Sequence, residues 1–109
     1  MSTLTTYQGS LLERILYSLR EPHTLFLSAV YEITQKNNRV ANLKTICEHS
    51  SIKPLIDKEN YTMSDISKLL GDLVLKSLLT HSSPVIDDKT VDAYAISEEA
   101  LLLIKKSTQ

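Results

Sequence analysis

One stripe of apolar residues constrains the fold of this chain more than any other sequence feature. Between residues 66 and 78 the apolar side chains recur every three or four positions, as they do on one face of an α-helix: Ile66, Leu69, Leu70, Leu73, Val74 and Leu78. Thr62 or Ser64 can cap this helix at its N-terminus. The sequence therefore predicts a long helix within residues 61–79 that buries Leu69, Leu70 and Leu73.

The helical spacing stops after residue 78, and residues typical of turns follow. Ser and Pro occupy 82–84, and Asp and Lys occupy 87–89. A returning strand over 91–96 would complete a two-stranded hairpin. Gly71, inside the long helix, costs about 1 kcal/mol relative to alanine and suggests that a neighbour packs closely there.

Three further helices are expected before the long one, and one after it. Ser10, Thr24 and Asn42 are the expected N-caps of the first three. Residues 52–60, which contain a proline and a charged stretch, are expected to form a connection without a helix. Ser97 is expected to start the last helix, with acidic residues at its N-terminus and lysines at its C-terminus.

This order of elements predicts a fold that is mainly α with a small β-hairpin. Three helices followed by a two-stranded hairpin form a winged helix-turn-helix, here with extra N- and C-terminal helices. We expect one winged-helix domain over residues 1–109, with a core at 24–96 and flanking helices at about 10–20 and 97–106.

Composition is typical of a soluble globular domain and argues against several other classes. Of the 109 residues, 42% are hydrophobic and 23% are charged, so the chain can bury a core. The net charge of -1 gives no basic field that would attract nucleic acid or an acidic membrane. The longest apolar run, 101–104, is too short to span a bilayer, and no signal peptide is expected. A single cysteine excludes an internal disulfide.

The side chains that could carry chemistry are scattered. His23, His49 and His81 lie on different segments, and one cysteine cannot complete a zinc site with them. Cys47 and His49 would point to different faces of a helix, so Cys47 is interpreted as a structural thiol. Two glycines are too few for a phosphate-binding loop. We therefore expect no catalytic residues, metal, cofactor or small-molecule ligand, and no enzyme activity.

The hydrophobic and turn pattern over about three-quarters of the chain resembles a known family. The segments TLFLSAVYEI, NLKTICEHSSIKPLIDKENYTMSDISKLLGDLVLKSLLTHSS and VDAYAISEEALLLI carry the likeness. They resemble the C-terminal winged-helix domain of the origin-recognition and replication-licensing AAA+ initiators. The resemblance implies a winged helix and, in many family members, DNA binding.

The charged residues of this chain differ from those of the DNA-binding members of the family, which carry basic residues on the recognition helix and in the wing. In the long helix Lys68 and Lys76 are balanced by two aspartates, and three aspartates in the wing oppose one lysine. Acidic groups repel phosphate, and nonspecific DNA affinity comes mainly from cations. The chain is therefore similar to a winged helix that has lost DNA binding.

The family includes a yeast heterochromatin relative of the largest origin-recognition subunit, whose winged helix serves self-association. The resemblance thus implies a nuclear, chromatin-silencing protein that forms a homodimer and binds nucleic acid weakly or not at all. Four consecutive apolar residues, 101–104, wrap around the last helix and are difficult for a small domain to cover. The expected dimer interface comprises Leu12, Leu16, Tyr94, Ile96, Leu102 and Leu103.

The alternative is a DNA-binding winged helix of a replication initiator or transcription regulator. In that case four lysines would contact phosphates: Lys53, Lys58, Lys68 and Lys76. One of the polar residues Tyr61, Thr62 or Ser64 would lie near a base edge.

Overall fold

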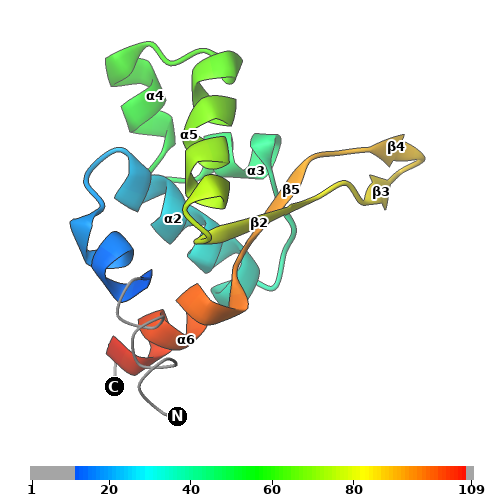
Figure 1. The fold of residues 1–109 in the computed structure, drawn as a ribbon. Coiled ribbons are helices and arrows are strands. Elements are labelled where there is room, and N and C mark those ends of the chain that lie inside the picture. Colours follow the sequence, from blue (N-terminus) through cyan, green and yellow to red (C-terminus); the bar gives the residue numbers. More distant parts are fainter. Residues whose placement is uncertain (1–11, 108–109) are drawn as a thin grey trace.

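The computed structural model of the chain describes residues 12–107 and is mostly helical (Figure 1). Residues 12–18 are helical, and five labelled α-helices follow: α2 (His23–Tyr31), α3 (Leu43–Glu48), α4 (Lys53–Glu59), α5 (Met63–Leu75) and α6 (Glu98–Ser107). A π-helical turn, η1 (Glu32–Lys36), continues α2. The mainly α prediction, with helices on both sides of the 24–96 segment, is confirmed.

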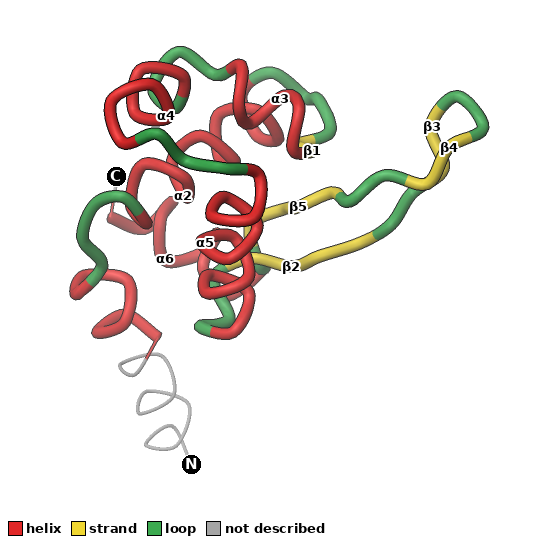
Figure 2. Tube along the Cα trace, turned by 90° about the horizontal axis from the view of Figure 1, so that it is seen from above, coloured by secondary structure: helices red, strands yellow, loops and turns green. Residues whose placement is uncertain are grey.

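The strands form two small antiparallel sheets: β1 (Ala41–Asn42), β2 (Leu79–Ser82), β3 (Val85–Ile86), β4 (Lys89–Thr90) and β5 (Ala93–Ile96). The larger sheet has the order β1-β5-β2, and β3 pairs only with β4. The predicted hairpin is thus present, and the extended pair at 41–42 adds a third strand. The hairpin projects far from the helices and carries β3 and β4 at its tip (Figures 1 and 2).

Two of the predicted N-caps are confirmed as complete capping boxes. Asn42 accepts a hydrogen bond from the Thr45 N–H at 2.9 Å, and Thr62 accepts one from the Asp65 N–H at 3.1 Å. In both boxes the backbone N–H of the cap residue in turn donates a hydrogen bond to the side chain three residues further on. The expected Thr24 cap is wrong, because α2 already begins at His23, with Pro22 as the N-cap residue. The Ser10 cap lies outside the described residues.

Residues 52–60, expected to be a connection, form helix α4. Pro54 lies in the first turn, where a missing N–H costs no hydrogen bond and a fixed φ favours the helix. Asn60 then ends the helix in the left-handed conformation, with φ 55°. The proline therefore starts a helix here instead of interrupting one.

The core lies where α2 and α5 pack together and α2 covers β5. Its largest completely buried side chains come from α2, α3 and α5 and from the residues just before α4 and β2: Phe26, Val30, Ile46, Ile52, Ile66, Leu70, Leu73 and Leu78. Leu69 was expected to be buried but is only half-buried, because it borders a surface hollow beside Tyr61. The expected close neighbour at Gly71 is also absent, since a Cβ atom there would meet nothing within 4 Å.

The start of α6 ties the C-terminal helix to the end of α5. The buried Ser97 hydroxyl donates to the Ser77 carbonyl at 2.7 Å and accepts from the Ala100 N–H at 3.2 Å. This is the predicted cap, and it also fixes where the strand β5 passes into the helix.

Candidate protein-interaction surfaces

The six residues expected to form a dimer interface occupy three different environments. Tyr94 and Ile96 are only 8% and 7% exposed, so the expectation that they belong to the dimer interface is wrong. The reason is topological: β5 is the central strand, flanked by β1 and β2, and α2 covers it. A strand that is enclosed in this way buries its alternate side chains within one copy.

Leu12 and Leu16 belong to the helical segment 12–18 and pack partly against the core. Leu16 lines a small hollow of about 210 Å³ between this segment, α2 and α6, together with Leu19, Thr24, Leu27, Ser28, Tyr31 and Ile104. These two leucines therefore attach the N-terminal helical segment to the domain and leave only part of their surface to solvent.

Among the described residues, the core cluster and the side chains packed against it include the other four residues but not Leu102 or Leu103. Helix α6 turns Ala100, Leu101 and Ile104 toward the core, and residues at i and i+4 share a helix face. Leu102 consequently points outward and is 70% exposed, while Leu103 is half-buried beside it. We call Leu102 and Leu103 the α6 surface.

A second apolar surface lies on α5, and sequence reasoning missed it. Leu75 is 85% exposed, and it borders a groove of about 570 Å³ between α5 and the strands β2 and β5. The groove is lined by Lys68, Gly71, Asp72, Val74, Leu75, His81 and Tyr94. One signal was available in the sequence: Leu75 is a leucine outside the buried stripe of its own helix.

The residues of the DNA-binding alternative are distributed over α4, the 60–62 loop and α5. All four lysines are exposed, and Ser64 and Lys68 share one face of α5. Lys53 meets Tyr61 and Thr62 at a hollow of about 450 Å³ between α3, α4 and the start of α5. The structure thus brings three of these residues together, but Lys68 and Lys76 lie elsewhere along α5.

In the DNA-binding alternative, the N-terminus of α5 would face phosphate. In the structure this helix end carries a carboxylate, that of Asp65. The hydrogen bond from the backbone N–H of Thr62 lowers the pKa of Asp65, and the Thr62 hydroxyl and the nearby Lys68 add to this effect. Asp65 is therefore ionised at neutral pH and occupies the position where a helix dipole would attract an anion.

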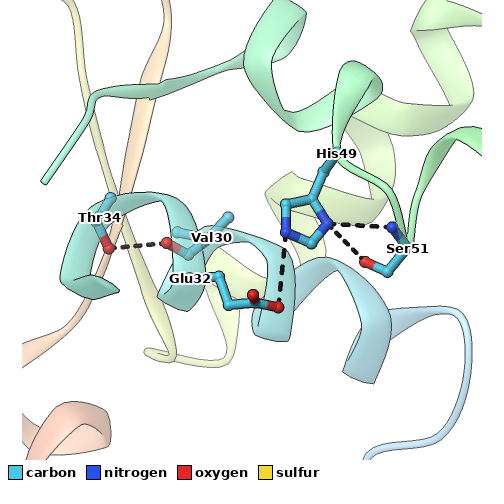
Figure 3. A network of polar contacts seen from close by, with 5 residues as sticks. All are labelled: Val30, Glu32, Thr34, His49 and Ser51. Atoms are coloured by element: carbon cyan, nitrogen blue, oxygen red, sulfur yellow. Dashed lines mark hydrogen bonds and ion pairs between the residues drawn. The ribbon is translucent and has the colours of Figure 1, made fainter. Parts of the chain in front are cut away.

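Each of the three histidines faces a carboxylate. His23 lies 3.2 Å from Asp72, and His81 lies 2.9 Å from Asp92. The third, His49, has its Nε2 3.6 Å from Glu32 and its Nδ1 2.8 Å from the Ser51 hydroxyl (Figure 3).

The serine, histidine and glutamate in Figure 3 have the residue types of a hydrolase triad, but their geometry is that of a structural turn. The Ser51 backbone N–H donates to the same Nδ1 at 3.2 Å, so the hydroxyl shares its acceptor with the backbone. None of the hollows described above is lined by any of these three residues. The network instead joins the loop after α3 to η1 (Figure 3).

The cysteine is partly buried, and the metal-binding residue types are dispersed within residues 12–107. Burial, and secondarily the charge of Glu48, raise the pKa of the Cys47 thiol, which disfavours the nucleophilic thiolate. In the same range, no group of three or more His, Cys, Asp or Glu residues is arranged to hold a metal ion.

Comparison with known proteins finds no match to a protein-family model, to a curated protein or to a solved structure. In the described part of the chain, no helix is long and apolar enough to cross a bilayer. The features available for assigning a function are therefore the α6 surface, the α5 groove and the distribution of charge.

Proposed function

We propose that this chain is a winged helix-turn-helix domain whose function is to bind protein, and that it forms a homodimer through the α6 surface. The sheet order β1-β5-β2 supports the fold, as does the passage from α5 directly into the first strand of a projecting hairpin. In this interpretation α2, α3 and α5 are the three helices of the motif and α4 is an insertion between the last two.

The observation that carries the homodimer is the outward position of Leu102, with Leu103 half-buried beside it. A leucine side chain removed from water contributes about 1.5–3 kcal/mol, which makes 70% exposure of Leu102 unfavourable in an isolated copy. A two-fold dimer needs only one self-complementary patch, and the exposed Leu102 face of α6 is the candidate for it.

Charge supports a protein partner over nucleic acid. The exposed face of the hairpin carries Asp87, Asp88 and Asp92 against Lys89, and α5 balances two lysines with two aspartates. The chromatin-silencing role and the nuclear location depend on the family resemblance alone and stay predictions.

Replacing Leu102 by glutamate tests the homodimer. We expect the wild-type chain to sediment as a dimer at about 50 µM and Leu102→Glu as a folded monomer, because a charge in the centre of a desolvated contact removes most of its affinity. Leu75→Glu is the matched control: it places the same charge on another exposed leucine and should leave this dimer intact. A wild-type chain that sediments as a monomer at this concentration would contradict the proposal.

DNA binding is the second candidate function, and one observation favours it. Helix α5 lies beside the projecting hairpin, as a recognition helix lies beside a wing (Figure 1). If the domain acts in this way, Ser64 and Lys68 are the residues placed to contact the duplex.

A duplex titration at several salt concentrations separates the two functions. We expect no retention of a short duplex at about 150 mM salt, because few cations are available to displace counterions. The measurement is fluorescence anisotropy, with Lys68→Ala as the comparison variant. Submicromolar binding with a steep salt dependence, weakened in Lys68→Ala, would establish the DNA-binding function instead.

A further inference from the structure

The exposed side of α5 has features that the fold of one copy does not explain. Ser64, Lys68, Gly71 and Leu75 follow one another at three- or four-residue spacing and form a solvent-facing stripe, which we call the α5 stripe. It borders the groove of about 570 Å³ described above. Leu75, at the C-terminal end of the stripe, is the most exposed of the large apolar side chains reported for the described residues.

Gly71, in the middle of the stripe, is not required by anything in a single copy. Its φ is negative, and a Cβ atom would meet nothing within 4 Å, so alanine would fit there and would favour the helix. Glycine is commonly found where another backbone approaches closely. The residue is therefore best explained by a partner that comes against α5 at this point.

The charges on α5 indicate which partner fits. Along the helix the order is Asp65, Lys68, Asp72 and Lys76, so that acidic and basic residues alternate. When a second α5 runs antiparallel about a two-fold axis near Leu70 and Gly71, Asp65 faces the other copy's Lys76 and Lys68 faces its Asp72. A parallel arrangement in the same register would instead place like charges together.

The same antiparallel arrangement accounts for the apolar and small residues. Gly71 lies opposite Gly71 of the second copy, which lets the two helices approach, and Leu75 of each copy covers Ser67 and Gly71 of the other. Asp72 can take part while it keeps its bond to His23, because 52% of its side chain is exposed. Within residues 12–107, no ion pair engages Lys68 or Lys76.

We propose that the α5 stripe is a second self-association surface, on which two copies pair their α5 helices antiparallel. The contact is additional to the α6 dimer of the proposed function, and the two together join dimers into larger assemblies. An interface of this kind occupies the face that a DNA-binding winged helix would turn toward the duplex, which explains why that face carries balanced charge.

Gly71→Leu tests the contact without removing anything from the core. A Cβ atom at this position meets nothing within 4 Å in one copy, so we expect the fold to be retained, whereas the larger side chain holds two α5 helices apart. In sedimentation velocity at about 1 mM we expect assemblies larger than dimers for the wild type, and dimers only for Gly71→Leu. Unchanged assemblies in Gly71→Leu, or a wild type that never exceeds a dimer, would overturn the proposal.

A charge exchange tests the antiparallel register. Lys68→Asp places two acidic groups opposite each other and should lower the association constant of the α5 contact about tenfold. The double variant Lys68→Asp with Asp72→Lys keeps opposite charges face to face across the two-fold axis and should restore association. Failure of the double variant to recover, while circular dichroism shows that it is folded, would exclude this register and overturn the proposal as stated.

Combining the variants separates this contact from the α6 dimer. Leu102→Glu should still form dimers at about 1 mM through the α5 stripe, and Leu102→Glu with Gly71→Leu should be monomeric. If Leu102→Glu alone has no effect while Gly71→Leu gives monomers, the α6 proposal fails and the α5 contact stands. If Gly71→Leu instead abolishes binding to a DNA duplex and leaves assembly unchanged, the stripe is a nucleic-acid surface and the proposal is wrong.

Discussion

Leu73→Ala should lower the free energy of unfolding by about 2–5 kcal/mol, as truncation of a packed leucine does. Leu73 is completely buried on the face of α5 that packs against α2, so its removal leaves a cavity that the two helices can close only in part. The effect can be measured by urea denaturation followed by circular dichroism, with the slope of the transition checked for constancy.

Leu75→Ala is the matched control for this measurement. It removes the same atoms two positions further along the same helix, from a side chain that is 85% exposed. The expected change is within about 0.5 kcal/mol, and the protein is measured at low concentration so that self-association does not contribute. Equal losses in the two variants would mean that α5 is rotated about its axis relative to the structure described here.

Phe26→Ala should have an effect at least as large, about 3–5 kcal/mol. Phe26 is the only phenylalanine, is completely buried, and lies on α2, the helix that contacts both α5 and β5. Its aromatic ring fills space between elements that are distant in the sequence, so no local rearrangement can replace it. Urea denaturation measures the loss, and the hairpin strands should unfold in the same transition.

Two control variants test whether the loss of stability in Phe26→Ala comes from the buried ring. Phe26→Leu keeps most of the apolar volume and should cost clearly less than the alanine variant. Tyr17→Ala removes an aromatic ring that is 68% exposed and should change stability by no more than about 0.5 kcal/mol. A small loss for Phe26→Ala would contradict the central position of α2 in the core.

Several elements of the fold could be predicted because their causes are local. The stripe from Ile66 to Leu78 predicts α5 through its spacing, and the capping residues Asn42, Thr62 and Ser97 mark helix starts through hydrogen bonds within three residues. The turn at Asp87 and Asp88, both with positive φ, follows from the tolerance of aspartate for that conformation.

Other features depend on which elements meet, which the sequence by itself does not contain. Pro54 has the same local preferences at the start of a helix and at the start of a loop. The packing of the surrounding chain, which the local sequence does not show, selects the helix α4 here. The expected role of Tyr94 and Ile96 was wrong because strand position is a property of the sheet: β5 lies between β1 and β2, and α2 covers it, so both side chains are buried.

The candidate surfaces, too, have some features that the sequence predicts and others that depend on how the elements pack. The order of residues is enough to show that the last helix carries more apolar residues than one helix face can bury, since four in succession must point to several sides. The folded domain determines that Leu101 and Ile104 face the core and Leu102 faces solvent, because this depends on how α6 is rotated against the other elements. It likewise determines that Gly71 meets open space and that Leu75 borders a groove, since both depend on where β2 and β5 lie beside α5.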